Sequence, residues 1–375
     1  MDRKLRVGVI FGGRSGEHEV SLVSASSIIH ALDPAKYEVV PIGITREGRW
    51  LSSGRALGLL KEHAPLDQEP ERHLVPDPTR RGLARTDGST EGVQPLDVVI
   101  PIIHGTYGED GTLQGLLELS NIPYVGAGVL GSALGMDKIV QKELFRQAKL
   151  PVAKYVWFLS SLCEERPARV AAAVARALKY PVFVKPANTG SSVGISKAHN
   201  RAELLDALAL ARTFDRKVIV EQGIPRAREI ECAVLGNDTP EASVPGEVVP
   251  SNEFYDYDAK YVDGKSRVEI PARLPASVAA RVRQLALRAF TALDLSGMAR
   301  VDFFVTRRTD RVVLNEVNTL PGFTSISMFP KLWEATGLSY PALLDRLIRL
   351  AIERHHQKSG LRTEYTPKQE WYKQP

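Results

Sequence analysis

Three side chains near the C-terminus, Asp302, Glu316 and Asn318, have the types and the spacing needed to hold a cation. Glu316 and Asn318 are two residues apart, so on a strand they share one face, and Asp302 belongs to the preceding apolar segment. Carboxylates flanked by valine and phenylalanine lose hydration, and like charges opposed across strands repel one another. A cation between them would stabilise this arrangement, and an all-oxygen ligand set suits Mg²⁺.

The elements that position these side chains are predicted to be the two strands of one hairpin. Residues 299–305 and 312–318 are apolar and β-branched, and a polar turn separates them. One register places Asp302 opposite Glu316, and a shift by one residue places it opposite Asn315. The alternative interpretation is that these polar side chains face solvent at the rim of a sheet.

Composition restricts the class of protein. A length of 375 residues favours two or three domains, and 43% hydrophobic with 25% charged residues is typical of globular proteins. The net charge is only +5 and no basic tract is interleaved with aromatic residues, so we expect no nucleic-acid partner. Cys163 and Cys232 lack metal-ligand spacing and are too few for a disulfide framework, which favours a cytoplasmic location. We expect neither a signal peptide nor a membrane helix.

The N-terminal segment predicts an α/β unit. An apolar strand at residues 5–11 leads into a glycine turn and then a helix from Glu17 to about Leu32. Arg14 stands where the dinucleotide fingerprint needs its second glycine, which argues against a nicotinamide-dependent dehydrogenase. Glu17 lies at the mouth of the turn, where it could bind a ligand ammonium, although an acidic residue in a first helical turn is also favoured by the helix dipole.

A second candidate site follows the strand at residues 181–186. Lys185 ends this strand, and a loop rich in glycine and serine follows at residues 187–194. The ammonium supplies charge and the loop supplies N–H and hydroxyl donors, a combination typical of phosphate sites. Residues 253–261 are polar and aromatic, which predicts either an exposed functional loop or a surface clamp. The fold class is therefore predicted as α/β, with an α+β C-terminal part.

The order of these motifs resembles that of the ATP-grasp enzymes, and their detail resembles the D-alanine:D-alanine ligases. The resemblance extends from residue 5 to about residue 350, and it rests on five segments, namely residues 12–21, 104–111, 185–194, 253–261 and 315–324. It implies a three-domain ATP-grasp architecture. The implied divisions are an N-terminal α/β substrate domain at 1–128 with an irregular insertion at 53–93, a central subdomain at 129–221, a C-terminal subdomain with the metal site at 222–356, and a tail at 357–375.

The resemblance also implies roles for individual residues. The residues implied to bind ATP are Lys138, Lys185, Glu221, Gln222, Ile224, Glu229, Tyr255 and Lys260. Some relatives have lysine at the position of Gln222, so the alternative is that backbone groups of this strand, and not the Gln222 side chain, bind adenine. Asp302, Glu316 and Asn318 would hold two Mg²⁺ ions, which Mn²⁺ could replace. The residues implied to act on D-alanine are Glu17, His104, Ser191, Lys260, Tyr261, Arg300, Gly322, Ser327 and Met328.

The implied reaction joins two D-alanines through a D-alanyl phosphate, which makes a peptidoglycan precursor. Glu17 would anchor the ammonium of the first D-alanine and connect through Ser191 to Tyr261, with residues 253–261 acting as a lid. Arg300 and the Gly322 N–H would stabilise the oxyanion. The implied partners are small molecules and a second copy of the chain in a homodimer. The rival functions are a ligase that forms an ester with D-lactate and a nucleotide-binding module without chemistry.

Overall fold

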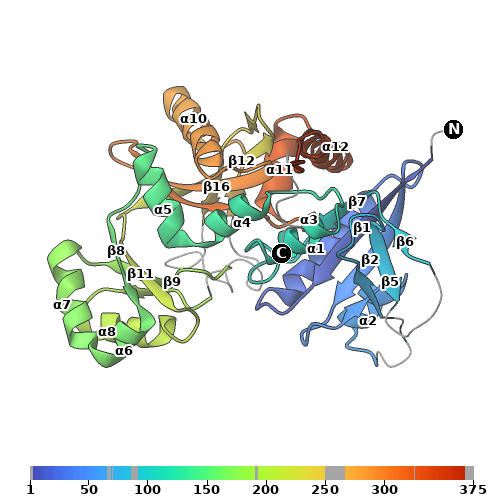
Figure 1. The fold of residues 1–375 in the computed structure, drawn as a ribbon. Coiled ribbons are helices and arrows are strands. Elements are labelled where there is room, and N and C mark those ends of the chain that lie inside the picture. Colours follow the sequence, from blue (N-terminus) through green and yellow to red (C-terminus); the bar gives the residue numbers. More distant parts are fainter. Residues whose placement is uncertain are drawn as a thin grey trace.

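The computed structural model describes residues 3–65, 69, 71–85, 92–190, 193–249, 267–324 and 326–367. Three larger sheets organise the chain, one in the blue N-terminal part, one in the green lobe and one in the yellow and orange region between them (Figure 1). The N-terminal sheet is largely parallel and the other two are antiparallel. The predicted fold class, α/β with an α+β C-terminal part, is confirmed.

The N-terminal sheet has the strand order β3-β2-β1-β7. Its elements are β1 (Leu5–Gly12), β2 (Tyr37–Ile44), β3 (Trp50–Leu51) and β7 (Val98–Pro101), with the helices α1 (His18–Ala31) and α3 (Thr112–Leu119). Strand β1 pairs in parallel with both β2 and β7, and its residues Val7 to Phe11 are buried because neighbours cover both faces. The chain segments that follow β1 and β7 therefore leave the sheet at one edge, where parallel α/β sheets bind ligands.

The predicted irregular insertion at residues 53–93 contains regular structure. Helix α2 (Ala56–Lys61) lies within it, and β4 (Arg72–Leu74) and β5 (Gly82–Arg85) form a small antiparallel sheet with β6 (Gln94–Pro95). Leu74 and Leu83 are buried and join a hydrophobic cluster with β2 residues. The prediction was wrong because these strands are too short to show periodicity, and their burial depends on packing against the main sheet.

The central lobe holds the second sheet, of order β10-β9-β11-β8. Its strands are β8 (Tyr155–Leu159), β9 (Val182–Pro186), β10 (Ser196–Ala198) and β11 (Lys217–Gln222), and its helices are α6 (Ser160–Glu165), α7 (Pro167–Ala177) and α8 (Arg201–Ala211). Val170, Val174 and Leu208 are buried against the sheet with apolar residues of β9 and β11. The opposite face of β9 and β11 is thereby left to carry Lys185 and Glu221.

The third sheet has the order β15-β14-β12-β16-β17, and β13 pairs with β12. Its strands are β12 (Ala227–Gly236), β13 (Glu241–Ala242), β14 (Gly246–Val249), β15 (Arg267–Glu269), β16 (Gly297–Thr306) and β17 (Val312–Asn318). The helices around it are α4 (Val129–Met136), α5 (Lys138–Gln147), α10 (Ala276–Ala292) and α11 (Met328–Ala335). Val282, Leu285 and Phe290 of α10 are buried against this sheet. The glycine-rich residues 124–135 predict a loop, but the structure shows helix α4 in most of this segment, because isolated glycines lower helix propensity without excluding a helix.

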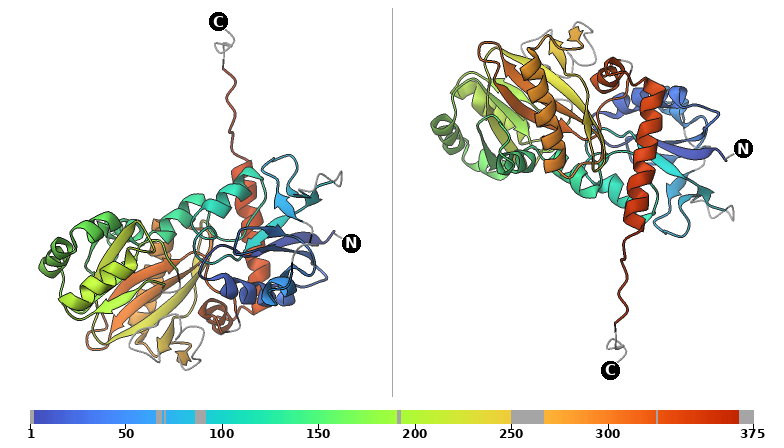
Figure 2. Two further views of the ribbon diagram at one scale, coloured as in Figure 1. Left: turned by 90° about the horizontal axis from the view of Figure 1, so that it is seen from below. Right: turned by 90° about the horizontal axis from the view of Figure 1, so that it is seen from above.

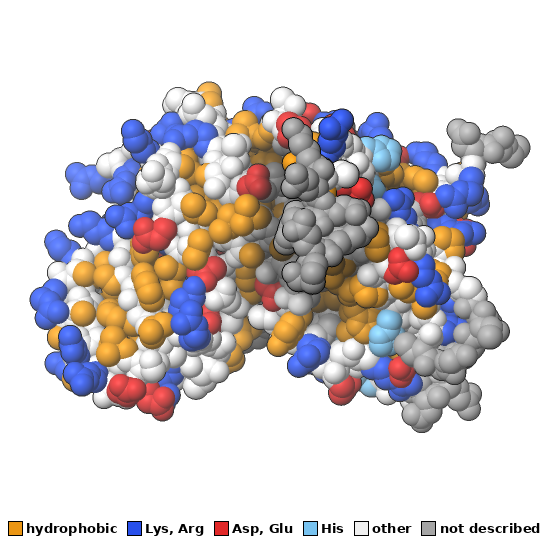
Figure 3. Space-filling model, viewed as in Figure 1, with side chains coloured by type: hydrophobic (Ala, Val, Ile, Leu, Met, Phe, Trp, Pro, Cys, Tyr) orange, Lys and Arg blue, Asp and Glu red, His pale blue; other side chains and the backbone are white. Residues whose placement is uncertain are grey.

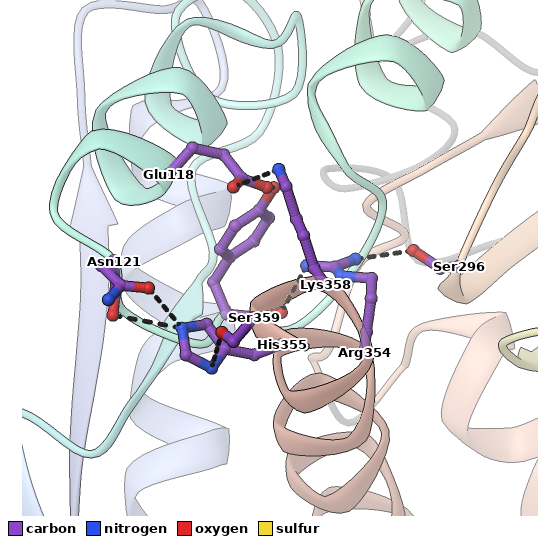
Figure 4. Close-up of polar contacts among 8 residues, drawn as sticks. Glu118, Asn121, Ser296, Arg354, His355, Lys358 and Ser359 are labelled. Carbon is purple, nitrogen blue, oxygen red and sulfur yellow. Dashed lines mark hydrogen bonds and ion pairs between the residues drawn. The ribbon is translucent and has the colours of Figure 1, made fainter. Parts of the chain in front are cut away.

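Helix α12 (Tyr340–Ser359) runs along the N-terminal part, as both views of Figure 2 show. The sequence predicts a closing helix from Ser339 to Glu353 and, because the residues from His355 onward are polar, a poorly ordered tail after it. The helix instead continues to Ser359, because its last turns bind the N-terminal domain (Figure 4). Arg354 Nη2 donates to the Tyr124 carbonyl at 2.9 Å, and Lys358 Nζ lies 2.6 Å from Glu118 Oε2.

Arg354 also joins the N-terminal domain to the third sheet. Its Nη1 atom donates to Ser296 Oγ at 2.6 Å, directly before β16 (Figure 4). The guanidinium carbon also lies 4.4 Å from the centre of the Tyr124 ring, a cation–π contact. The position of the N-terminal domain relative to the hairpin is therefore fixed by α12. Among the described residues, no helix combines the length and the apolar character that a membrane crossing requires.

Candidate active site

The hairpin of β16 and β17 has the register in which Asp302 lies opposite Glu316. The register shifts directly after Asp302, since Phe303 pairs with Leu314, and Asn315 is therefore the extra residue of a β-bulge. The alternative pairing of Asp302 with Asn315 is excluded. Both carboxylates line one cavity, so they do not simply face solvent at a sheet rim.

Arg300 occupies the centre of a buried carboxylate cluster. Its Nε and Nη2 atoms each donate to one oxygen of Asp302 at 2.7 Å, and Nε lies 3.0 Å from Glu231 Oε2. Asn318 Nδ2 donates to Asp302 Oδ2 at 3.0 Å. Burial alone would lower the pKa of Arg300, but the charges of Asp302 and Glu231 raise this pKa well above its usual value. Arg300 is therefore always charged, and it fixes the orientation of Asp302.

Glu231 is a residue of this site that the sequence interpretation missed. It lies opposite Asp302 on β12, is 6% exposed, and lines the same cavity as Glu229. The available signal was the spacing of Glu229 and Glu231, two acidic residues on one face of a strand that is mostly apolar from Ile230 onward. Such a pair requires a cationic partner, and Arg300 on the next strand supplies it.

A second charged cluster consists of Lys142, Lys185 and Glu221. Lys142 Nζ lies 3.2 Å from Glu221 Oε1, and Lys185 Nζ donates to Glu221 Oε2 at 3.1 Å. Burial would raise the pKa of Glu221, but the two ammonium groups hold this pKa below its usual value. Burial would lower the pKa of Lys185, yet Glu221 and Glu316 raise it. One carboxylate is therefore shared by two buried cations.

A cavity of about 310 Å³ lies between the central and the third sheet and joins the two clusters. The predicted site residues that line it are Lys185, Glu221, Gln222, Ile224, Glu229, Arg300, Asp302 and Glu316. Gln222 Oε1 accepts a hydrogen bond from the Lys179 N–H at 3.2 Å, so this oxygen already has a partner within the central lobe. On the face drawn in Figure 3, acidic side chains lie near the hollow between the lobes and basic ones mostly along the outer edge.

The predicted substrate residue His104 lies three residues after the end of β7. Its Nδ1 atom is 3.1 Å from the Leu320 carbonyl, and its Nε2 atom is 3.2 Å from Ser24 Oγ. Burial lowers the pKa of His104, which favours a neutral imidazole. The side chain therefore connects the N-terminal domain to the segment that follows the hairpin.

Glu17 is buried close to the glycine loop that follows β9. A Cβ atom on Gly190 would collide with Glu17 Oε2, so this approach requires glycine. Lys138 Nζ donates to the Thr189 carbonyl at 2.5 Å in the same loop. The predicted ammonium site and the predicted phosphate loop are thus adjacent, although Glu17 and Gly190 are far apart in the sequence.

Glu109 is a further acidic residue that the sequence interpretation did not single out. Its Oε1 atom accepts a hydrogen bond from the Gly105 N–H at 2.9 Å. Burial and the neighbouring Glu17 raise the pKa of Glu109 to about 8. A buried carboxyl group, Glu17, and a half-buried one, Glu109, therefore lie at this end of the N-terminal sheet.

The segment after the hairpin brings Gly322 and Ser327 together. A Cβ atom on Gly322 would lie 2.8 Å from Ser327 Oγ, and this oxygen also accepts a hydrogen bond from the Thr324 N–H at 3.0 Å. Met328 is 6% exposed and packs against Gly246 in the hydrophobic core. The predicted residues Ser191, Tyr255, Lys260 and Tyr261 lie outside the described residues.

Comparisons with known proteins agree with this geometry. Residues 6–127 match the family model for the D-ala D-ala ligase N-terminus, and residues 144–349 match that for the C-terminus. A D-alanine–D-alanine ligase from Thermoanaerobacter sp. (strain X514) is 53% identical over 357 residues, which cover 95% of this chain and 98% of the relative.

Solved structures of the same kind superimpose on the chain. The D-alanine-D-alanine ligase from Coxiella burnetii has a TM-score of 0.82 at 38% identity, covering 96% of this chain and 97% of the other. The VanG D-Ala:D-Ser ligase from Enterococcus faecalis has a TM-score of 0.82 at 37% identity, covering 93% of this chain and 100% of the other. On these matches and on the arrangement of its site, the chain belongs to the D-alanine–D-alanine ligase family, which has the ATP-grasp fold.

Proposed function

We propose that the protein uses ATP to join two D-alanine molecules into D-alanyl-D-alanine, a precursor for peptidoglycan. The observation that carries this proposal is the cavity shared by the Lys142–Lys185–Glu221 cluster and the Arg300 carboxylate cluster. One end offers ammonium groups for phosphates, and the other offers oxygens for a metal ion. Family membership supports the same reaction.

The nucleotide would lie between the central and the third sheet. Lys185 lines the cavity beside Glu221, and Ile224 adds an apolar wall, which suits an adenine ring next to its phosphates. Glu229 also lines the cavity, where a carboxylate can accept hydrogen bonds from ribose hydroxyls. Lys138 and the glycine loop lie beside Glu17, so we propose that they bind the phosphate end of the nucleotide.

The donor atoms of Asp302, Glu316 and Asn318 fit Mg²⁺. In the described part of the chain, no group of three or more histidine, cysteine or acidic residues is arranged around one point, so this fit depends on two carboxylates and one amide. Asp302 and Glu316 line the cavity, and Asn318 is hydrogen-bonded to Asp302. Bound Mg²⁺ would neutralise phosphate charge. Asp302 must then exchange part of its contact with Arg300 for the metal.

The first D-alanine would be bound with its ammonium at Glu17. Its carboxylate oxygen attacks the γ-phosphorus of ATP in line, the bond from this phosphorus to the β,γ-bridging oxygen breaks, and ADP leaves. The product is a D-alanyl phosphate. Because Glu17 and the phosphate loop are adjacent, the two reactants can be held at short distance, which supplies much of the rate acceleration in such a reaction.

The amine of the second D-alanine would then attack the carbonyl carbon of the D-alanyl phosphate. Phosphate leaves, and the amine loses a proton as the peptide bond forms. Arg300 and the Gly322 N–H are proposed to stabilise the tetrahedral oxyanion, and Ser327, packed against Gly322, is proposed to bind the second carboxylate. His104 is buried, and its contact with the Leu320 carbonyl positions the Leu320 end of the same segment.

The direct test is to incubate the protein with ATP, Mg²⁺ and D-alanine and to measure phosphate release and dipeptide by mass spectrometry. We expect one phosphate for each D-alanyl-D-alanine. Reactions that contain both D-alanine and D-serine or D-lactate test the acceptor site, and we expect D-alanyl-D-alanine as the main product. Absence of product with D-alanine alone, or a preference for the mixed product, would refute the proposal.

A further inference from the structure

Lys142 is a buried lysine to which neither the motifs nor the proposed reaction gives a role. It lies on α5 one turn after Lys138, and its side chain is 2% exposed. Burial of a lysine is expensive and lowers the pKa of Lys142, so it requires specific partners. Its Nζ atom lies 3.2 Å from Glu221 Oε1 and donates to the Asn315 carbonyl at 2.8 Å.

These two partners belong to the two ends of the nucleotide cavity. Glu221 is the second-last residue of β11 on the central sheet, and Asn315 is the bulged residue of β17 that precedes Glu316. A bulge interrupts the ladder of strand hydrogen bonds, and the lysine ammonium satisfies the carbonyl at this point. Lys142 therefore bridges the central sheet and the hairpin that carries the metal ligands.

Lys142 and Lys185 differ in their access to the cavity. Lys185 lines the cavity and its side chain is 10% exposed, compared with 2% for Lys142. Both contact Glu221, one at each carboxylate oxygen. A phosphate that enters the cavity can therefore attract Lys185 away from Glu221, and the carboxylate then depends on Lys142 for its counter-charge.

We propose that Lys142 is a positioning residue that remains bound to Glu221 and so allows Lys185 to leave this carboxylate for the nucleotide phosphates. Its second contact, to the Asn315 carbonyl, holds the Lys142 ammonium beside Glu221. This inference rests on the proposed nucleotide site, but it does not depend on which acceptor the enzyme uses. Without Lys142, Lys185 would be the one lysine of the two that still pairs with Glu221. Moving Lys185 to a phosphate would then leave the buried Glu221 carboxylate without an ammonium, which lowers the affinity for the nucleotide.

The test is a double-mutant cycle on nucleotide binding, measured by calorimetry with ADP and Mg²⁺ and with adenosine. We expect Lys142→Met to weaken ADP by about tenfold, the size of a typical coupling between charged groups in contact, and to weaken adenosine much less. In a Glu221→Gln background, Lys185 has no carboxylate to leave, so Lys142→Met should change ADP affinity by less than about twofold. Steady-state rates should show a higher KM for ATP with an unchanged KM for D-alanine.

The matched control is Lys217→Met, which removes another lysine that joins β11 to α5, through Asp137. We expect this variant to retain its ADP affinity. If Lys142→Met proves unstable in a thermal melt, Lys142→Gln keeps a donor for Asn315 without the charge and should show the same cycle.

Equal losses of ADP affinity in both backgrounds, or equal losses for ADP and adenosine, would show that Lys142 is merely structural and would overturn the inference. If the unmodified enzyme binds ADP but makes no dipeptide, the proposed function fails and the cycle still decides the role of Lys142. If it binds no ADP, both proposals fail.

Discussion

The two charged clusters that face the nucleotide cavity have opposite excess charge. Around Glu221, two ammonium groups share one carboxylate. Around Arg300, one guanidinium holds Glu231 and Asp302, and Glu316 lies beside them. A cavity with a cationic and an anionic end suits a ligand with anionic phosphates and a bound metal ion. The phosphates would compensate the excess positive charge at one end, and the metal ion would compensate the excess negative charge at the other.

The largest effect is expected when the cation of the acidic cluster, Arg300, is replaced. Arg300→Ala should lower turnover by on the order of a hundredfold or more, because an oxyanion donor is lost. It also leaves Glu231 and Asp302 without their guanidinium, so the melting temperature should fall. Arg300→Lys keeps a charge without the two-point contact and should recover stability more than turnover. Unchanged turnover in Arg300→Ala would remove Arg300 from the mechanism.

A smaller change reduces the anionic excess itself. Glu316→Gln should raise the Mg²⁺ concentration for half-maximal rate by about tenfold or more, as expected for a weakened metal ligand. The readout is a Mg²⁺ titration at saturating ATP and D-alanine. Glu247→Gln is a suitable control, since Glu247 pairs with Arg228 on the same sheet. A normal Mg²⁺ requirement in Glu316→Gln would contradict the assignment of the metal site.

Glu231 also affects the acidic cluster, because it competes with Asp302 for Arg300. In Glu231→Gln the guanidinium loses one carboxylate and should bind Asp302 more tightly, which hinders transfer of Asp302 to a metal ion. We expect a rise of about threefold in the Mg²⁺ requirement, in keeping with the loss of one ion pair in a site where Asp302 remains as a partner of Arg300. A Mg²⁺ titration identical to that of the unmodified enzyme would show that Glu231 only supports the fold.

The smallest effect is expected for a substitution of Glu109, which lies outside both clusters. Its pKa is raised from 4.5 to about 8, so the folded protein retains a proton that the unfolded chain releases. The free energy of unfolding should therefore decrease as pH rises through this interval. Glu109→Gln keeps an acceptor for the Gly105 N–H and should reduce the fall in melting temperature between about pH 5 and about pH 9. An identical fall in both proteins would contradict the shifted pKa of Glu109.

Local sequence was sufficient to predict the residues whose neighbours in the chain define them. The apolar and β-branched runs at residues 299–305 and 312–318 predicted the hairpin of β16 and β17. The spacing of Glu316 and Asn318 predicted their common face, because strand periodicity is a local property. The strand and loop around Lys185 were predicted for the same reason. The family motifs then supplied the candidate site as a set.

The amino-acid sequence by itself therefore determined the fold class, the hairpin and most of the charged residues that line the cavity. The tertiary structure decided which charges meet, because Lys142 and Asn315 are 173 residues apart and Lys142 has no pattern that distinguishes it from a surface lysine. It also decided the sharing of Arg300 between Glu231 and Asp302 and the extension of α12 to Ser359. Such contacts arise from the packing of separate elements, and their cost or benefit depends on burial, which only the folded chain defines.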